Sequence, residues 1–541
     1  MRAASVPANA KPKTHQDASS KGSWPERTVH VLTQGDLFDE NQTGVSRGRS
    51  SEESQRKLEG AKGRRNNCKA TNATVDRAEP AQTSAVGSGS PTEHGTNPNR
   101  PEGEALVNGE GSGTAATTRS EGQRPAMQEV TMEAAVEEAN WDAALHAVER
   151  NNGAPGPDGM RAKELRDHLA KHGEGIKAKL LRGSFEPSAA RRKEIPKPNG
   201  GTRPLSIPNV LDRFVQQLLL QIMQPSFEPR FSEASYGFRP GRSAHQAVRA
   251  ARHHAQEGRD WVVDMDITKF FDHVNHDILM AQVSCVVKDK RVLKLIGRFL
   301  RAGIVLPDGC KVSTEEGTPQ GGPLSPLLAN IYLDQLDKEL ERRGLKHVRY
   351  ADDCNIYVSS QKAAQRAMES IKEWIAKRLK LQVNVEKSGT GRVWERKFLG
   401  FILTIALLIA ISPQAVAKFK DQVRTKWDAR QSMTSEEMRD QWRNYQRGWW
   451  AYYGKAEDRK SVLRLSGWIR RHIRKCFWLR WHNAKGRRAA FVRLGIPPSR
   501  VDIAHSSRGA WRMGRHPVMQ EALNNRRLKR YGFITPSDLA G

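Results

Sequence analysis

Cysteine is scarce in this chain of 541 residues, and the five that occur are widely spaced. The odd number and the lack of any CxxC pair argue against a disulfide framework and against a cysteine-bound zinc site. The pattern is typical of a protein from a reducing cytoplasm. The cysteines are Cys68, Cys285, Cys310, Cys354 and Cys476.

Long apolar runs are also missing. The first residues lack the apolar stretch of a signal peptide, and the longest apolar run, residues 401–411, is too short to span a bilayer. We interpret this run as a buried strand and expect no membrane partner.

Acidic residues are outnumbered by basic ones, with 60 Asp and Glu against 89 Lys and Arg and a formal charge of +29. This balance suits a polyanionic partner, and nucleic acid is the first candidate. A basic ribosomal or membrane-surface protein has a similar balance, although usually in a shorter chain or in one amphipathic segment. Charge alone therefore leaves the class of protein open.

Apolar periodicity is nearly absent from the first 125 residues, which are rich in Ser, Thr, Gly, Asn and Pro. Such a segment buries too little surface to offset its ordering entropy, so we predict a disordered low-complexity extension over residues 1–126. Within it, residues 29–38 (VHVLTQGDLF) form a candidate docking segment. Alternatively, translation begins at Met127 or Met132, where helix-like sequence starts, and the upstream part is not native.

The rest of the chain is long enough for more than one domain. Up to about residue 410, short β-type runs (261–267, 348–358) alternate with amphipathic helical stretches (211–223, 361–379), which predicts an α+β fold. After Ser412 the strand signal disappears, and residues 442–453 and 461–481 read as helices. We therefore predict regions 127–260 and 261–411 followed by an all-α domain, 412–541.

Two adjacent acids, Asp352 and Asp353, lie between β-rich flanks, as at the tip of a hairpin. Neighbouring carboxylates repel each other unless a cation neutralises them, and their oxygens are the ligands that Mg²⁺ prefers. A turn with two aspartates and no ligand is the common alternative. The pair alone is a weak signal.

A second acidic strand strengthens that signal, because Asp264 and Asp266 interrupt the apolar run that begins at Trp261. Charged groups inside an apolar strand need a compensating partner. Three carboxylates from two strands can hold two Mg²⁺ ions about 4 Å apart for phosphoryl transfer. Asp264 and Asp266 share one strand face, so geometry does not decide between them.

Three motifs then occur in order: Ser235-Tyr-Gly-Phe-Arg-Pro-Gly-Arg-Ser-Ala-His245, Gly317-Thr-Pro-Gln-Gly-Gly-Pro-Leu-Ser-Pro326 and Tyr350-Ala-Asp-Asp353. The last matches the YxDD box of reverse transcriptases. Together the motifs resemble the reverse transcriptase/maturase encoded by bacterial group II introns, and the resemblance spans roughly Asn140 to Leu539. It implies a right-hand polymerase, with fingers (127–260), a palm with an antiparallel catalytic sheet (261–411) and a thumb/maturase domain (412–541).

The resemblance also implies a set of catalytic residues. The family pattern Asp-hydrophobic-x-x-Phe-Phe-Asp aligns Asp266, not Asp264, with the first catalytic acid. Asp266, Asp352 and Asp353, with the backbone of Ile267, would then bind two Mg²⁺ ions, for which Mn²⁺ is a possible substitute. Asp264 becomes a supporting or structural residue.

Residues around the incoming deoxynucleotide follow partly from chemistry and partly from the resemblance. Lys197 and Arg203, in a Gly-rich loop, suit a triphosphate, since the Arg fork matches phosphate oxygens. The remaining implied contacts are Gln320, Ala351, and either Phe270 or Phe271 as the ring that excludes a 2′-hydroxyl. Each has an alternative: a solvated hairpin tip for Lys197 and Arg203, a turn without a ligand for Gln320, and a core position for the phenylalanines.

Two further segments match the family. Asn384 and Lys387 align with a position where the Lys lies near the leaving phosphates as a possible proton donor, although a surface Lys is an equal alternative. Residues 398–401 (FLGF) resemble the strand that supports the primer, whereas 402–411 are more apolar than in relatives. The hairpin boundaries there stay open.

Between Trp442 and Arg500 there are 16 Lys or Arg, two acids and six Trp. Trp442, Tyr445, Trp449 and Tyr452 follow helical spacing, so we expect most aromatics to form a helical core. The basic residues then form an outer face for phosphates, and any exposed ring can stack on bases. The residues predicted to contact RNA are Arg443, Arg447, Arg470, Arg471, Arg474, Lys475 and Arg480.

This end of the chain resembles the maturase-specific domain, which implies binding of intron RNA and support of its splicing. No CxxC pairs or room for a nuclease module follow, as in endonuclease-less group IIC proteins. The predicted function is RNA-directed DNA synthesis and splicing for a mobile intron that retrohomes into target DNA, in the bacterial cytoplasm near the nucleoid. The alternatives are a non-catalytic RNA-binding maturase and a reverse transcriptase recruited to host repair or defence. The implied partners are group II intron RNA, an RNA template with a DNA primer, dNTPs and target DNA.

Overall fold

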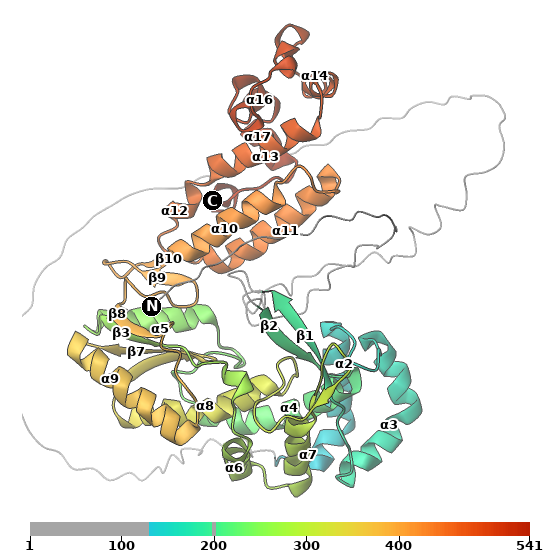
Figure 1. The fold of residues 1–541 in the computed structure, drawn as a ribbon, viewed down its shortest axis with the longest axis vertical. Coiled ribbons are helices and arrows are strands. Elements are labelled where there is room, and N and C mark those ends of the chain that lie inside the picture. The colour runs from blue at the N-terminus through green and yellow to red at the C-terminus, as the bar shows by residue number, and fades with distance from the viewer. Residues whose placement is uncertain (1–128, 197–201, 541) are drawn as a thin grey trace, which may run out of the picture. The chain divides into compact units, whose positions relative to one another are not determined.

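The computed structural model describes residues 129–196 and 202–540. The predicted extension 1–126, including the segment 29–38, lies outside these residues, as does Lys197. Within the described part, strands end at residue 411 and only helices follow (Figure 1). This confirms an α+β region followed by an all-α region.

The first part of the α+β region consists of helices around a small mixed sheet with strand order β2-β1-β4-β5. β1 and β2 form an antiparallel hairpin, and β1 pairs with β4 in parallel. Trp141 and Phe214 pack edge to face at the centre of its helices. The elements are α1 (Met132–Val136), α2 (Glu138–Asn151), α3 (Leu165–Leu181), β1 (Ala190–Pro196), β2 (Thr202–Ile207), α4 (Val210–Phe227), β4 (Ile304–Val305) and β5 (Lys311–Val312).

The second part is built on an antiparallel sheet with strand order β6-β7-β3-β8. Its strands are β3 (Trp261–Met265), β6 (Lys346–Tyr350), β7 (Asp353–Val358) and β8 (Gly389–Arg392). The connecting helices are α5 (Ala244–Gln256), α6 (His276–Val286), α7 (Lys290–Arg301), α8 (Ser325–Arg342) and α9 (Gln361–Trp374), which continues as a π-helical turn, Ile375–Leu379.

The two faces of this sheet join different hydrophobic cores. Val263, Met265 and Ile356 pack with α8, α9 and the N-terminal helices. Val262 and Tyr357, one residue along each strand, join a second core with α5 and the C-terminal helices. Because side chains alternate along a strand, Asp264 and Asp266 share the face of Val262, where the second core ends.

The apolar run 401–411 is a hairpin and not the single buried strand that its composition indicates. β9 (Phe401–Leu403) pairs antiparallel with β10 (Ile409–Ile411). The side chain of Thr404 accepts a hydrogen bond from the Leu408 amide and closes the turn. Ile405 at the tip is 79% exposed. Periodicity cannot locate a turn made of apolar residues.

The C-terminal helices pack around aromatic side chains. Of those that follow helical spacing, Trp442 and Tyr452 are buried and Tyr445 and Trp449 are partly buried, and Trp427 and Trp478 join the same core. The predicted helix 461–481 is interrupted near Leu465. The helices are α10 (Pro413–Lys426), α11 (Ser435–Tyr453), α12 (Lys460–Leu463), α13 (Ser466–Arg480), α14 (Ala484–Arg493), α15 (Ala510–Met513), α16 (Pro517–Ala522), α17 (Asn525–Arg530) and α18 (Pro536–Leu539). None of the helices in the described ranges is long and apolar enough to cross a membrane.

Candidate active site and nucleic-acid interface

The two adjacent aspartates lie at the tip of the β6–β7 hairpin. Tyr350 pairs with Asp353, which leaves Ala351 and Asp352 as a two-residue turn. Ala351 has φ +58°, a left-handed conformation that tight hairpin turns require and that is costly for a residue with a Cβ. This turn presents both carboxylates at the end of the sheet.

β3 brings the third acid to the same place. Asp264 pairs with Asn355 and Met265 with Cys354, so the same register sets Asp266 opposite Asp353. Burial raises the pKa of Asp353 well above its usual value, and the charges of Asp264, Asp352 and Asp266 raise it further. The acids predicted from two separate segments are therefore close enough to repel one another.

Asp264 has surroundings different from those of Asp266. Its side chain is 18% exposed, and Arg396 approaches its carboxylate at 3.9 Å. Burial raises the pKa of Asp264 to about 6, while the charge of Arg396 opposes that shift. Its role as a supporting or structural residue stays a prediction.

The donor set suits a divalent cation, since hard carboxylate oxygens bind Mg²⁺ and a cation would offset the repulsion at Asp353. Across residues 129–196 and 202–540, however, no three acidic, His or Cys side chains converge as a preformed metal site. At Ile267, the hydrogen bonds that join it to Val383 are made by its neighbours Thr268 and Asp266. Neither bond uses the carbonyl oxygen of Ile267, the predicted backbone ligand.

The backbone of Asp266 is hydrogen-bonded to the short loop 384–388. The Asn384 amide donates to the Asp266 carbonyl oxygen at 2.8 Å, and the Ser388 hydroxyl accepts from the Asp266 amide at 2.9 Å. The Asn384 side chain accepts from the amides of Glu386 and Lys387, which closes an Asx-type turn. The turn directs Lys387 Nζ to 3.1 Å from Asp266 Oδ2. Lys387, predicted near the leaving phosphates, thus lies against the carboxylate of Asp266, the first of the predicted catalytic acids.

The predicted nucleotide contacts lie on loops that pack against one another. Phe270 and Phe271 are 2% and 7% exposed, and Phe270 also packs against Tyr332 in the core. The Thr318 amide donates to the Phe271 carbonyl oxygen at 2.7 Å, and the Gln320 carbonyl oxygen accepts from the Ser206 amide at 2.8 Å. The Gly317–Pro326 motif is thereby joined both to the phenylalanine loop and to β2.

Arg203 lies on β2, where its backbone pairs with Ile195. The described residues therefore place the strand that carries Arg203 but not its guanidinium. Its predicted role at the triphosphate, like that of Lys197, stays a prediction.

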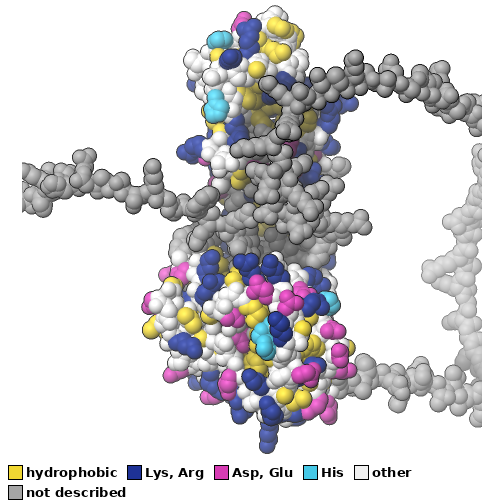
Figure 2. Space-filling view, turned by 90° about the vertical axis from the view of Figure 1, so that its right-hand side faces the viewer, with side chains coloured by type: hydrophobic (Ala, Val, Ile, Leu, Met, Phe, Trp, Pro, Cys, Tyr) yellow, Lys and Arg dark blue, Asp and Glu magenta, His cyan; other side chains and the backbone are white. Residues whose placement is uncertain are grey.

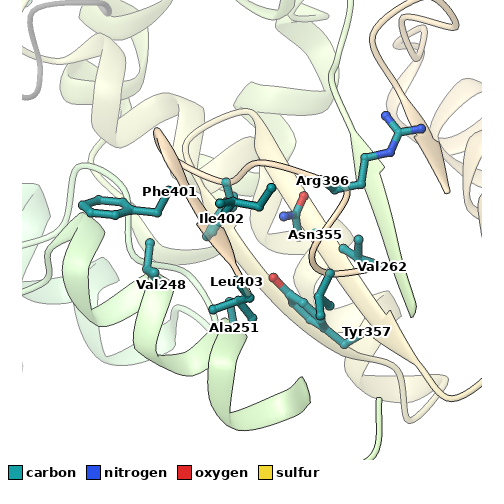
Figure 3. Close-up of a pocket in the computed structure, with 11 residues that line it drawn as sticks. Val248, Ala251, Val262, Asn355, Tyr357, Arg396, Phe401, Ile402 and Leu403 are labelled. Atoms are coloured by element: carbon teal, nitrogen blue, oxygen red, sulfur yellow. The ribbon is translucent and has the colours of Figure 1, made fainter. Parts of the chain in front are cut away.

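A small cavity lies against the same sheet face as the acids (Figure 3). Val248 and Ala251 of α5, Val262 and Tyr357 of the sheet, and residues 401–403 of β9 line it. Its volume of about 20 Å³ is enough for about one water molecule. Asn355 also faces it, with a buried Oδ1 that lacks a hydrogen-bond partner within the described residues.

The basic residues of the C-terminal helices divide into two groups. Arg447 is exposed, and Arg443 is 41% exposed with a long contact of 3.9 Å to Asp440. Lys475 is half-buried. These three remain candidates for RNA contact, and the part of this region visible in Figure 2 shows mainly Lys and Arg among its charged side chains.

Arg474 requires a correction, because it is 6% exposed and its Nε donates to the Leu523 carbonyl oxygen at 2.9 Å. It ties α13 to the segment before α17 and is not available as a surface phosphate contact. Arg470, Arg471 and Arg480 also make internal contacts, with Asp538, with the ring and carbonyl oxygen of Trp511, and with the Gln431 carbonyl oxygen respectively.

Three residues of the site were not predicted from the sequence: Gly237, Asn330 and Arg349, which lie behind the Ala351–Asp352 turn. Gly237 lies within the Ser235–His245 motif and Arg349 lies on the strand that leads to the turn, but neither was given a role, and Asn330 lies outside the three motifs.

Two family profiles match this chain in succession. The family profile of reverse transcriptases (RNA-dependent DNA polymerases) matches residues 195–403, and that of the group II intron maturase-specific domain matches residues 416–495. Among solved structures, a telomerase from Candida albicans aligns with a TM-score of 0.35 at 11% identity, over 69% of this chain and 66% of that chain. This low TM-score and identity do not relate the two proteins in fold or function.

Protein YkfC of Escherichia coli is 34% identical over 273 residues, which are 43% of this chain and 71% of YkfC. The group II intron-encoded protein LtrA of Lactococcus lactis is 40% identical over 171 residues, 31% of this chain and 28% of LtrA. Nuclear intron maturase 1 of Arabidopsis thaliana is 43% identical over 28% of each chain. The chain thus spans most of YkfC but less than a third of the two intron proteins. The first profile contains the carboxylate hairpin and the second follows it, and the chain belongs to the family of group II intron-encoded reverse transcriptases/maturases.

Proposed function

We propose that this protein synthesises DNA on an RNA template at Asp266, Asp352 and Asp353, and that its C-terminal helices bind group II intron RNA to assist splicing. The observation that carries the polymerase assignment is the meeting of three acids from two neighbouring strands at one end of an antiparallel sheet. The two family profiles support both halves of the proposal.

In this proposal the three carboxylates and the Ile267 carbonyl oxygen bind two Mg²⁺ ions. Bound there, the ions would activate the primer 3′-hydroxyl and stabilise charge on the leaving pyrophosphate. Gln320 and Ala351 border the nucleotide, together with Lys197 and Arg203. Phe271 is the better candidate for the ring that excludes a 2′-hydroxyl, since Phe270 packs into the core against Tyr332.

The finer assignments rest on the sequence motifs. We assign residues 127–260 to the fingers, 261–411 to the palm and 412–541 to the thumb. We further propose that the protein is of the endonuclease-less type and is encoded by a bacterial intron that retrohomes into target DNA. The lack of CxxC pairs after residue 411 supports the absence of a zinc-bound nuclease module within these residues.

Primer extension on an RNA template with Mg²⁺ and dNTPs tests the polymerase. The double variant Asp352→Asn, Asp353→Asn should lose cDNA synthesis, because the neutral amides cannot hold the cations. Asp502→Asn, at an acid that is 83% exposed in the C-terminal region, is the matched control and should retain full activity. Full activity in the double variant would refute the site.

The maturase half needs a separate assay. Splicing of an RNA that contains the flanking intron, at a Mg²⁺ concentration too low for self-splicing, should require the protein. The polymerase-dead variant should still support it, since the proposed RNA contacts Arg443 and Arg447 lie outside the carboxylate site. Splicing that is equally fast without protein would refute this half.

A further inference from the structure

The catalytic hairpin rests on an ion pair from which the described structure excludes water. Arg349, on β6, and Asp337, on α8, are both 0% exposed. The guanidinium Nε donates to both Asp337 oxygens at 2.8 and 3.0 Å, and Nη2 donates to Oδ2 at 2.5 Å. Burial disfavours the Asp337 carboxylate, but the charge and hydrogen bonds of Arg349 hold its pKa down to about 2. Both partners are therefore charged.

The remaining donors of Arg349 reach the turn that carries the catalytic acids. Nη1 donates to the Ala351 carbonyl oxygen at 3.0 Å and to Asn330 Oδ1 at 3.1 Å. Nη2 also donates to the Ser235 hydroxyl at 2.8 Å. Ala351 is the residue with φ +58°, so its strained conformation is bonded directly to the buried guanidinium.

A second segment, Ser235–Phe238, also contacts the turn. The amide of Asn330 donates to the Gly237 carbonyl oxygen at 2.8 Å, and the Tyr236 amide donates to the Arg349 carbonyl oxygen at 2.9 Å. A Cβ on Gly237 would overlap the backbone nitrogen of Ala351 and lie 3.0 Å from the carbonyl carbon of Tyr350. The Ser235–Phe238 segment thus packs directly against the turn backbone.

Stability alone does not explain this arrangement. A buried ion pair is often no more stable than apolar side chains of similar volume, because desolvation offsets the attraction of the charges. Planar guanidinium geometry, in contrast, can fix several acceptors in one arrangement. The acceptors here come from α8, from the Ser235–Phe238 segment and from the turn itself.

We propose that Arg349 is a positioning residue for DNA synthesis. Together with Asp337, Asn330 and the close packing of Gly237 against the Ala351 backbone, it fixes the Ala351–Asp352 turn so that the catalytic carboxylates face Asp266. This inference rests on the proposed polymerase function. Because Arg349 is fully buried and bonded to the Ala351 carbonyl oxygen, it acts through the turn and not by contact with the substrate.

The test replaces the pair by apolar side chains of similar size, Arg349→Met with Asp337→Leu, in the full chain. The single Arg349→Met change would leave a buried uncompensated charge and is less informative. The folded double variant should bind primer–template with unchanged affinity while its single-turnover rate of nucleotide addition falls about 10–100-fold, since displacing a reacting group by about 1 Å costs rates of this order. Half-maximal activity should also require more Mg²⁺, a shift that a purely structural role would not produce.

Gly237→Ala provides an independent perturbation that leaves the ion pair intact. It should lower the same rate at least about 10-fold, because the new methyl group must displace the turn. Gly175→Ala is the matched control, since a Cβ there meets no atom within 4 Å, and its rate should stay within about twofold of wild type.

The outcomes separate this inference from the function on which it rests. If the wild-type protein synthesises no DNA, the proposed polymerase function is refuted. If the wild type is active but the folded double variant or Gly237→Ala stays within about twofold of its rate, the positioning role of Arg349 is overturned and the polymerase function stands. If the double variant does not fold, Gly237→Ala decides the question.

Discussion

Lys387 offers a prediction in which two roles of one side chain can be separated. Its ammonium lies 3.1 Å from Asp266 Oδ2, and the two side chains are 67% and 32% exposed. Ion pairs this exposed contribute about 0–1 kcal/mol, so Lys387→Met should leave the free energy of unfolding nearly unchanged. If Lys387 donates a proton to the leaving pyrophosphate, the same change should slow nucleotide addition about 10²–10⁴-fold. That loss corresponds to about 3–5 kcal/mol in the activation barrier, well above the stability effect.

Single-turnover primer extension measures the rate, and urea denaturation measures the stability. Lys377→Met is the matched control, because Lys377 is about as exposed as Lys387, at 72% against 67%, and pairs with Glu373 at 2.6 Å, away from the acids. A nucleotide analogue with a less basic leaving group should restore much of the lost rate, since such a group needs less protonation. If the Lys387→Met variant stays within about threefold of wild type, the proton-donor role is refuted. An equal loss with both leaving groups would assign Lys387 to charge compensation at Asp266 instead.

Three further predictions concern stability and RNA binding. Burial raises the pKa of Asp212 to about 7, so its contribution to stability is full below about pH 4 and is lost as the pH rises to 7. Asp212→Asn should therefore stabilise the protein at pH 8, by at most about 4 kcal/mol. Urea midpoints of variant and wild type that are equal at both pH 5 and pH 8 would contradict this. Trp442→Ala should cost about 3–5 kcal/mol in urea denaturation, because the ring is fully buried in the C-terminal core. Arg447→Gln should weaken RNA binding and reduce the slope of log affinity against log salt concentration by about one phosphate contact. Arg474→Met should alter stability and leave that slope unchanged. Equal slopes for the two variants would refute the distinction.

The elements of the polymerase region were predictable where local pattern and tertiary environment agree. The run of apolar residues around Asp264 and Asp266 predicted β3, and the flanks of Asp352 and Asp353 predicted the β6–β7 hairpin; both are present. The segment 401–411 shows the opposite case. Its turn consists of apolar residues, and the hydrogen bond from the Leu408 amide to the Thr404 side chain that closes it has no composition signature.

Burial of charge was the least predictable property. Arg447 and Arg474 occur in similar basic, aromatic-rich helices, yet one is exposed and the other is buried with its guanidinium on a backbone carbonyl oxygen. Charge counts treat both as phosphate contacts, because a sequence does not say which side of a helix its neighbours cover. The partner of Arg474 lies 49 residues away, beyond the reach of any helical periodicity.

The same reasoning applies to the residues behind the catalytic turn. The contacts of Arg349 span 114 residues to Ser235 and 12 to Asp337, and the carbonyl oxygen of Gly237 is bonded by Asn330, 93 residues away. Each motif seen in the sequence is a separate piece, and only the fold brings the glycine of one motif against the turn of another. A carboxylate pair at a hairpin tip is common, but here the left-handed alanine is bonded to a buried guanidinium and packed against a glycine. We propose that these contacts hold the pair in a single orientation. In this proposal, that orientation distinguishes a catalytic turn from an ordinary one, and it depends on residues that the Tyr350–Asp353 motif does not contain.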